Sequence, residues 1–195
     1  MHGLINKAIE VFVRQTYGVN RWKAVMAKTN LGFAEFEAML PYDASVTRRV
    51  LLAMRDVFGR PCKLMLEDLG TFLVTSPMLP AVRRLLRFGG VDYTDFLHSL
   101  EDLPGRVKLA VDDLDLPPLD LIETGETEFR LHCHPGLPGY SQVMLGVLRA
   151  MADDFGTLAI LELRKHPHGG DVISVQVVEG AYATGKSFEL GGVPA

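Results

Sequence analysis

Apolar residues in the first half of the chain recur at three- and four-residue steps, which is the period of an amphipathic helix. This spacing predicts a helix over 4–13, a short helix that carries Trp22 after a cap at Asn20, and a longer helix that begins at a Ser45 cap. A further apolar helix is expected over 64–73. The first half is therefore predicted to be helical.

Prolines mark the limits of the next helices. Pro80 suits the first turn of a helix, and Gly89-Gly90 ends that helix. The segment that begins at Phe96 also has helical spacing, but Pro104 interrupts it and helical sequence resumes behind it. Proline in a helix interior removes a backbone donor and costs about 3 kcal/mol. The sequence therefore predicts a break at this point.

The period changes to two after residue 117, as expected of half-buried strands. A helix over 140–155 follows, and then strands over 158–163 and 172–178 around a turn at 168–171. Helices followed by antiparallel strands with one inserted helix predict an α+β fold. In the clearest strand, one face is apolar and the other polar: Phe129, Leu131 and Cys133 alternate with Arg130, His132 and His134.

Composition narrows the class of protein. The 195 residues suffice for one domain or two small ones, and the net charge of −4 with no basic cluster argues against nucleic acid as a partner. No apolar run reaches the roughly 18 residues that span a bilayer, and the polar N-terminal stretch is unlike a signal peptide. Two distant cysteines form no disulfide framework, so a cytoplasmic location is expected.

Several short motifs follow one another along the chain. They are Met1-x-Gly3-x-x-Asn6, Tyr17-Gly18, Trp22, Tyr42-Asp43, Gly70-Thr71-Phe72, Leu85-Leu86, Phe96-Leu97-x-x-Leu100 and Leu131-His132. Their order resembles the H-NOX (heme nitric oxide/oxygen binding) domain, above all the N-terminal domain of the beta subunit of soluble guanylate cyclase. The resemblance covers about residues 1–180. It implies an α+β fold with a helical lobe over about 1–60, a lobe of helices and antiparallel sheet over 61–180, and an extension over 181–195.

Both heme-binding signatures of the family are missing here. The axial histidine falls on Pro104, which has no donor atom for iron. The Tyr-x-Ser-x-Arg motif for the heme propionates reads Cys133, Pro135 and Leu137, and a leucine offers carboxylates no charged partner. We therefore expect the family cofactor, heme b, to be absent or bound by a non-standard ligand.

Two other side chains are candidate iron ligands. His98 precedes Pro104 by six positions, so on a helix it is turned about 120° from the ligand direction and is expected to face solvent. Cys133 faces the inner side of its strand, and its thiolate would be able to bind iron, although a buried cysteine is usually just a small apolar residue.

The resemblance also assigns an apolar pocket between the lobes. Its residues either close into a core or keep a different apolar ligand. They are Leu4, Ile5, Leu73, Phe96, Leu100, Pro117, Val143, Met144 and Val147.

Other chemistry is weakly indicated. The histidines of His132-x-His134 and His166-x-His168 would be able to approach one metal ion if their strands were neighbours. No acidic residue is evident beside them, and the nearby prolines and glycines are typical of loops. No metal site is therefore predicted. Neither neighbouring histidine shares a face with Cys133, and no Ser/His/Asp order or phosphate-binding loop is present, so an enzyme is not expected.

The resemblance predicts a signalling domain that acts in trans on a cyclase, a histidine kinase or a diguanylate cyclase. Two alternatives remain open, which are a binding protein for another apolar molecule and a purely structural interaction domain.

Overall fold

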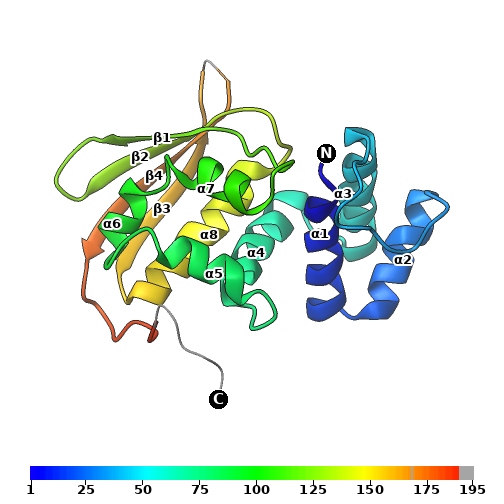
Figure 1. Cartoon of the computed structure of the whole chain (residues 1–195), viewed down its shortest axis with the longest axis horizontal. Coiled ribbons are helices and arrows are strands. Elements are labelled where there is room, and N and C mark those ends of the chain that lie inside the picture. Colours follow the sequence, from blue (N-terminus) through cyan, green and yellow to red (C-terminus); the bar gives the residue numbers. More distant parts are fainter. Residues whose placement is uncertain (168, 189–195) are drawn as a thin grey trace. The chain divides into compact units, whose positions relative to one another are not determined.

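The computed structural model describes residues 1–167 and 169–188 (Figure 1). Contacts group the chain into two compact units, Met1–Leu69 and a second unit that begins at Gly70. The division falls inside helix α4 (Cys62–Thr75), later than the residue 60 that the resemblance implies. In the described residues, no helix is both long enough and apolar enough to cross a membrane.

Besides the first part of α4, the first unit contains three helices whose apolar faces bury a shared core. Phe12, Trp22 and Met54 are each 2% exposed in this core. The bounds of the helices are α1 (Gly3–Thr16), α2 (Val19–Thr29) and α3 (Ala44–Phe58).

The predicted helices are present, but two predicted caps are wrong. Gly18 precedes α2 with a φ of 91°, a conformation that favours glycine, so Asn20 lies inside the helix. Asp43 precedes α3, and its carboxylate accepts a hydrogen bond from the Ser45 backbone N–H at 2.8 Å. Ser45 is therefore the capped residue rather than the cap.

The second unit places helices against one antiparallel sheet, as the α+β prediction requires. The strands run in the order β1-β2-β4-β3. Helix α8 contacts β3 and β4, and Figure 1 shows it lying along the sheet. The helices are α5 (Pro80–Arg87), α6 (Tyr93–His98), α7 (Leu103–Ala110) and α8 (Tyr140–Phe155), and the strands are β1 (Leu119–Glu123), β2 (Glu128–Cys133), β3 (Leu158–Lys165) and β4 (Asp171–Glu179).

The strand register sets which side chains meet. On one side of β2, Asp120 pairs with His132, and on the other Asp171 pairs with Cys133. His168, part of the predicted turn between β3 and β4, lies outside the described residues.

Helix α8 forms the centre of the second core. Leu148 and Met151 are fully buried, and the Tyr93 hydroxyl donates to the Leu148 carbonyl at 3.1 Å. The backbone of α4 lies against α8 at Gly70, where any Cβ would collide with the Val143 carbonyl oxygen. The glycine therefore permits the close approach of these two helices.

The expected C-terminal extension is described only as far as residue 188. This part packs back on the end of α8, where the Ala183 N–H donates to the Gly156 carbonyl at 2.9 Å and the Lys186 N–H donates to the Asp154 carbonyl at 2.8 Å. The division into a domain over 1–180 and an extension over 181–195 stays a prediction.

Candidate functional site

The position that the resemblance assigns to the axial histidine lies where two short helices meet. Helix α6 ends at His98 and α7 begins at Leu103, so Pro104 is in the first turn of α7. A missing N–H costs nothing there, because the first N–H groups of a helix have no partner within it. The Leu100 carbonyl accepts a hydrogen bond from the Leu103 N–H at 3.1 Å. The predicted break at Pro104 is confirmed, and it separates two helices rather than bending one.

Most of the predicted pocket residues lie in the second unit and contribute to its core. Phe96 and Leu100 are 0% exposed, and Pro117, Met144 and Val147 are also buried. The half-buried ones are Leu73, Pro104, Leu137 and Val143. Leu4 and Ile5 belong to α1 of the first unit and are half-buried as well. A joint pocket for all of these residues stays a prediction.

Cys133 lies on the inner face of β2, as the alternation predicted. It is 2% exposed, and burial together with the charge of Asp171 raises the pKa of its thiol to about 12. The thiol is therefore protonated at neutral pH in the metal-free chain, and binding iron would require it to lose this proton. Its neighbours His132 and His134 lie on the outer, more exposed face.

A cavity of about 380 Å³ opens between the end of β2 and the start of α8. The three positions of the propionate motif, Cys133, Pro135 and Leu137, all line it. Its wall also includes Ser141, Lys165 and Asp171. The structure thus gathers the three motif positions at one cavity, together with polar residues that sequence reasoning had not singled out.

Asp171 is the buried acid of this cavity, with 8% exposure. The Ser141 hydroxyl donates to Oδ2, and Lys165 Nζ lies 2.8 Å from Oδ1. Burial acts to raise the pKa of the Asp171 carboxyl, but the hydrogen bonds from Lys165 and Ser141 outweigh it and hold the pKa below its usual value. Asp171 is therefore an anion at neutral pH.

A sequence signal for Asp171 existed in the two glycines before it. Gly170 has a φ of 76°, and a Cβ at this position would collide with the Cys133 carbonyl oxygen. Only glycine lets the turn approach β2 so closely, and this approach brings Asp171 to the side of Cys133.

The residues present do not fit heme b in the way the family holds it. Pro104 has no donor atom for iron, and Leu137 has no charge for a propionate. His98 is exposed, and its Nε2 lies 3.5 Å from Glu123 Oε1, in agreement with the predicted solvent-facing role.

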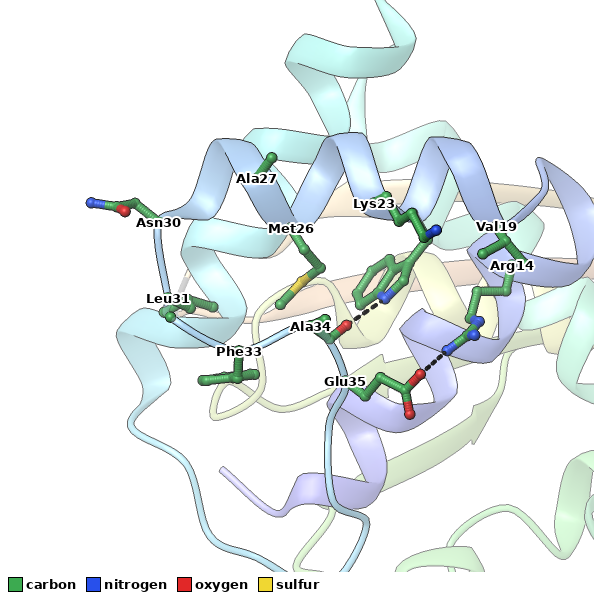
Figure 2. Close-up of a pocket in the computed structure, with 12 residues that line it drawn as sticks. Arg14, Val19, Lys23, Met26, Ala27, Asn30, Leu31, Phe33, Ala34 and Glu35 are labelled. Atoms are coloured by element: carbon green, nitrogen blue, oxygen red, sulfur yellow. Dashed lines mark hydrogen bonds and ion pairs between the residues drawn. The ribbon is translucent and has the colours of Figure 1, made fainter.

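The first unit has a groove of its own, of about 420 Å³, between α2 and the segment that follows it (Figure 2). The Trp22 indole N–H donates to the Ala34 carbonyl at 2.9 Å. Arg14 Nη1 lies 3.0 Å from Glu35 Oε1 and 2.7 Å from Oε1 of the buried Glu10. None of the predicted site residues lines this groove, so we assign it no part in the candidate site.

Comparison with known sequences gives a consistent result. A model of the haem-NO-binding family matches residues 2–162. The chain is 22% identical over 169 residues to soluble guanylate cyclase gcy-31 and 27% identical over 185 residues to soluble guanylate cyclase gcy-35, both from Caenorhabditis elegans. These alignments cover 86% and 91% of this chain but 24% and 27% of the relatives, so the chain spans about a quarter of their length.

Solved structures show the same fold. The Fe(II) unliganded H-NOX protein from K. algicida superposes with a TM-score of 0.79 at 16% identity, over 94% of this chain and 100% of that one. A mutant of the T. Tengcongensis H-NOX protein gives a TM-score of 0.75 at 11% identity, over 92% and 99%. The α+β fold predicted from the sequence is confirmed, and with a family model that matches most of its length, the chain belongs to the haem-NO-binding (H-NOX) family.

Proposed function

We propose that this chain is a sensory domain of the H-NOX family that does not hold heme through the axial histidine and the propionate motif. The observation that carries the proposal is Pro104 in the first turn of α7, because no side-chain atom at this position is able to bind iron. Leu137 at the cavity wall supports it, since a leucine offers no charge to a propionate.

The output of such a domain is the regulation of a signalling protein rather than catalysis of its own. Two relatives are named soluble guanylate cyclases, which supports a cyclase-type partner. A cyclase, a histidine kinase or a diguanylate cyclase that the domain regulates in trans stays a prediction.

Expression with excess hemin tests the heme part of the proposal. We expect the purified chain to show no sharp Soret band at one heme per chain. A stoichiometric Soret band would contradict the proposal. If that band were lost in Cys133→Ala, the thiolate alternative would replace it.

A gain-of-function variant tests whether position 104 is the lost ligand position. Pro104→His returns an imidazole to the first turn of α7, and we expect it to bind more hemin than the wild-type chain. Gly105→His is the matched control, because Gly105 is the exposed next residue and a Cβ there meets nothing within 4 Å. Equal hemin binding by both variants would contradict the assignment of position 104.

A second candidate function is the binding of a different small molecule, and the cavity beside Cys133 favours it. The sequence predicts an apolar ligand, whereas Ser141, Lys165 and Asp171 line this cavity, so a molecule with one polar end fits better. Native mass spectrometry of protein purified from its own host tests this candidate. A recurring bound mass supports it, and repeated spectra of the ligand-free chain count against it.

A further inference from the structure

The outer face of the sheet carries a cluster of side chains that the candidate site does not use. Asp120 on β1, His132 on β2 and His134 just after β2 each contribute one ligand atom, and these atoms all lie within 4.8 Å of one another. Asp120 Oδ2 is 2.6 Å from His134 Nε2 and 4.0 Å from His132 Nδ1.

The register of the strands explains why the three residues meet. Asp120 is paired with His132 across the β1–β2 ladder, and His134 is two residues further along the same face. The sequence-based expectation that no acidic residue accompanies these histidines is therefore wrong. It failed because the alternation along one strand does not reveal which residue of another strand lies opposite.

His132 is oriented in the way that metal-binding imidazoles are. Its Nε2 lies 3.2 Å from the Gly169 carbonyl oxygen, and a carbonyl only accepts, so Nε2 carries the proton and Nδ1 presents its lone pair. An imidazole that donates its second N–H to a carbonyl is a frequent support of metal ligands. The His132 ring also packs against the rings of His134 and His166, each with a centroid distance of 4.5 Å.

We propose that Asp120, His132 and His134 bind a zinc ion on this face, with a fourth position open to water. Two imidazoles and one carboxylate are common zinc ligands, whereas Mg²⁺ and Ca²⁺ prefer all-oxygen sites. Ligand atoms around tetrahedral zinc are ~3.3–3.5 Å apart for bonds of ~2.0–2.2 Å. The side chains are 54%, 21% and 36% exposed, so each has room to adjust to that spacing.

Zinc titration of the untagged full chain against a chromophoric chelator tests the site. We expect one Zn²⁺ per chain, with affinity at least ~10-fold lower in Asp120→Asn and in His134→Asn. His98→Gln is the matched control, because His98 pairs with Glu123 in the same unit and, among the described residues, belongs to no group of three possible metal ligands. We expect this control to bind zinc like the wild-type chain.

Nitrogen-15 spectra of the imidazole rings supply a readout that a merely structural role would not give. Zn²⁺ should shift His132 Nδ1 and His134 Nε2 and leave His98 unchanged. Without zinc, the thermal unfolding curves of Asp120→Asn and His134→Asn should stay close to the wild-type curve, because the Asp120–His134 pair is exposed and contributes little to stability. Weaker binding then reports a lost ligand.

Three results would overturn the site: no zinc binding, equal affinity in the ligand variants and the wild-type chain, or an equal loss in His98→Gln. None of them depends on how the hemin experiments turn out.

Discussion

The two faces of strand β2 differ in chemistry although their residues alternate one by one. Leu131 and Cys133 point into the core and are 0% and 2% exposed, whereas Arg130, His132 and His134 lie on the outer side. The position at which the family's propionate motif begins, Cys133, is on the inner face. The two histidines and Asp120 lie on the opposite face, and this is where we propose the metal site.

Truncating a side chain to alanine should lower the free energy of unfolding much more on the inner face of β2 than on the outer face. Leu131→Ala removes a fully buried side chain and should lower the free energy of unfolding by about 2–5 kcal/mol. Arg130→Ala, one residue away on the outer face, should change it by less than about 0.5 kcal/mol. Urea unfolding followed by far-UV circular dichroism measures both. Similar losses of unfolding free energy in the two variants would contradict the claim that only the inner face of β2 is part of the core.

In the turn that approaches β2, an alanine substitution should lower the free energy of unfolding more at Gly170 than at Gly169. Gly170→Ala combines a positive φ with a collision against the Cys133 carbonyl oxygen and should cost at least about 2 kcal/mol. Gly169→Ala also has a positive φ, of 101°, but meets nothing within 4 Å and should cost about 1 kcal/mol. Thermal unfolding of the two variants checks this order, and the reverse order would show that the close approach is not what the turn requires.

Asp171, which lines the cavity beside Cys133, should make the free energy of unfolding depend on pH in the acid range. Its pKa is lower in the folded chain, so its contribution is complete above the unfolded value of about 3.9 and is lost as the pH falls through the folded value. Asp171→Asn should therefore cost about 1–2 kcal/mol at neutral pH, and this difference should shrink at lower pH.

Lys165→Gln is the control for this carboxylate, because the Lys165 side chain is 85% exposed and should contribute under about 1 kcal/mol. Urea unfolding of both variants from neutral to acid pH gives the comparison. A cost of Asp171→Asn that grows as the pH falls would contradict the assigned direction of the pKa.

Periodicity predicted the elements of the second unit closely. The apolar stripe with Met144 and Val147 predicted a helix over 140–155, and α8 has these bounds. The alternation around Leu131 predicted that Cys133 faces inward and that His132 faces outward, because a strand of period two has one choice of buried face. Local spacing was sufficient for both features because each depends on one element alone.

The contacts between elements were not predictable in the same way. Asp120 meets His132 because β1 and β2 pair in one particular register, and no residue pattern within either strand specifies that register. Asp171 reaches Ser141 through the approach of a turn to the start of α8. The sequence did not predict the helix caps at Gly18 and Asp43, because several residues near the start of each helix are suitable as N-caps.

The smallest effect is expected at His132 itself. In zinc-free buffer with a chelator, His132→Gln should change the free energy of unfolding by less than about 0.5 kcal/mol, because the ring packs on the outer face and the glutamine amide also has an N–H for the Gly169 carbonyl. Added zinc should then raise the melting temperature of the wild-type chain and leave His132→Gln nearly unchanged, since an ion that binds only the folded state stabilises it. A loss of more than about 1 kcal/mol without zinc would mean that the histidine stack supports the sheet. In that case the outer face of β2 would be structural, like the inner one.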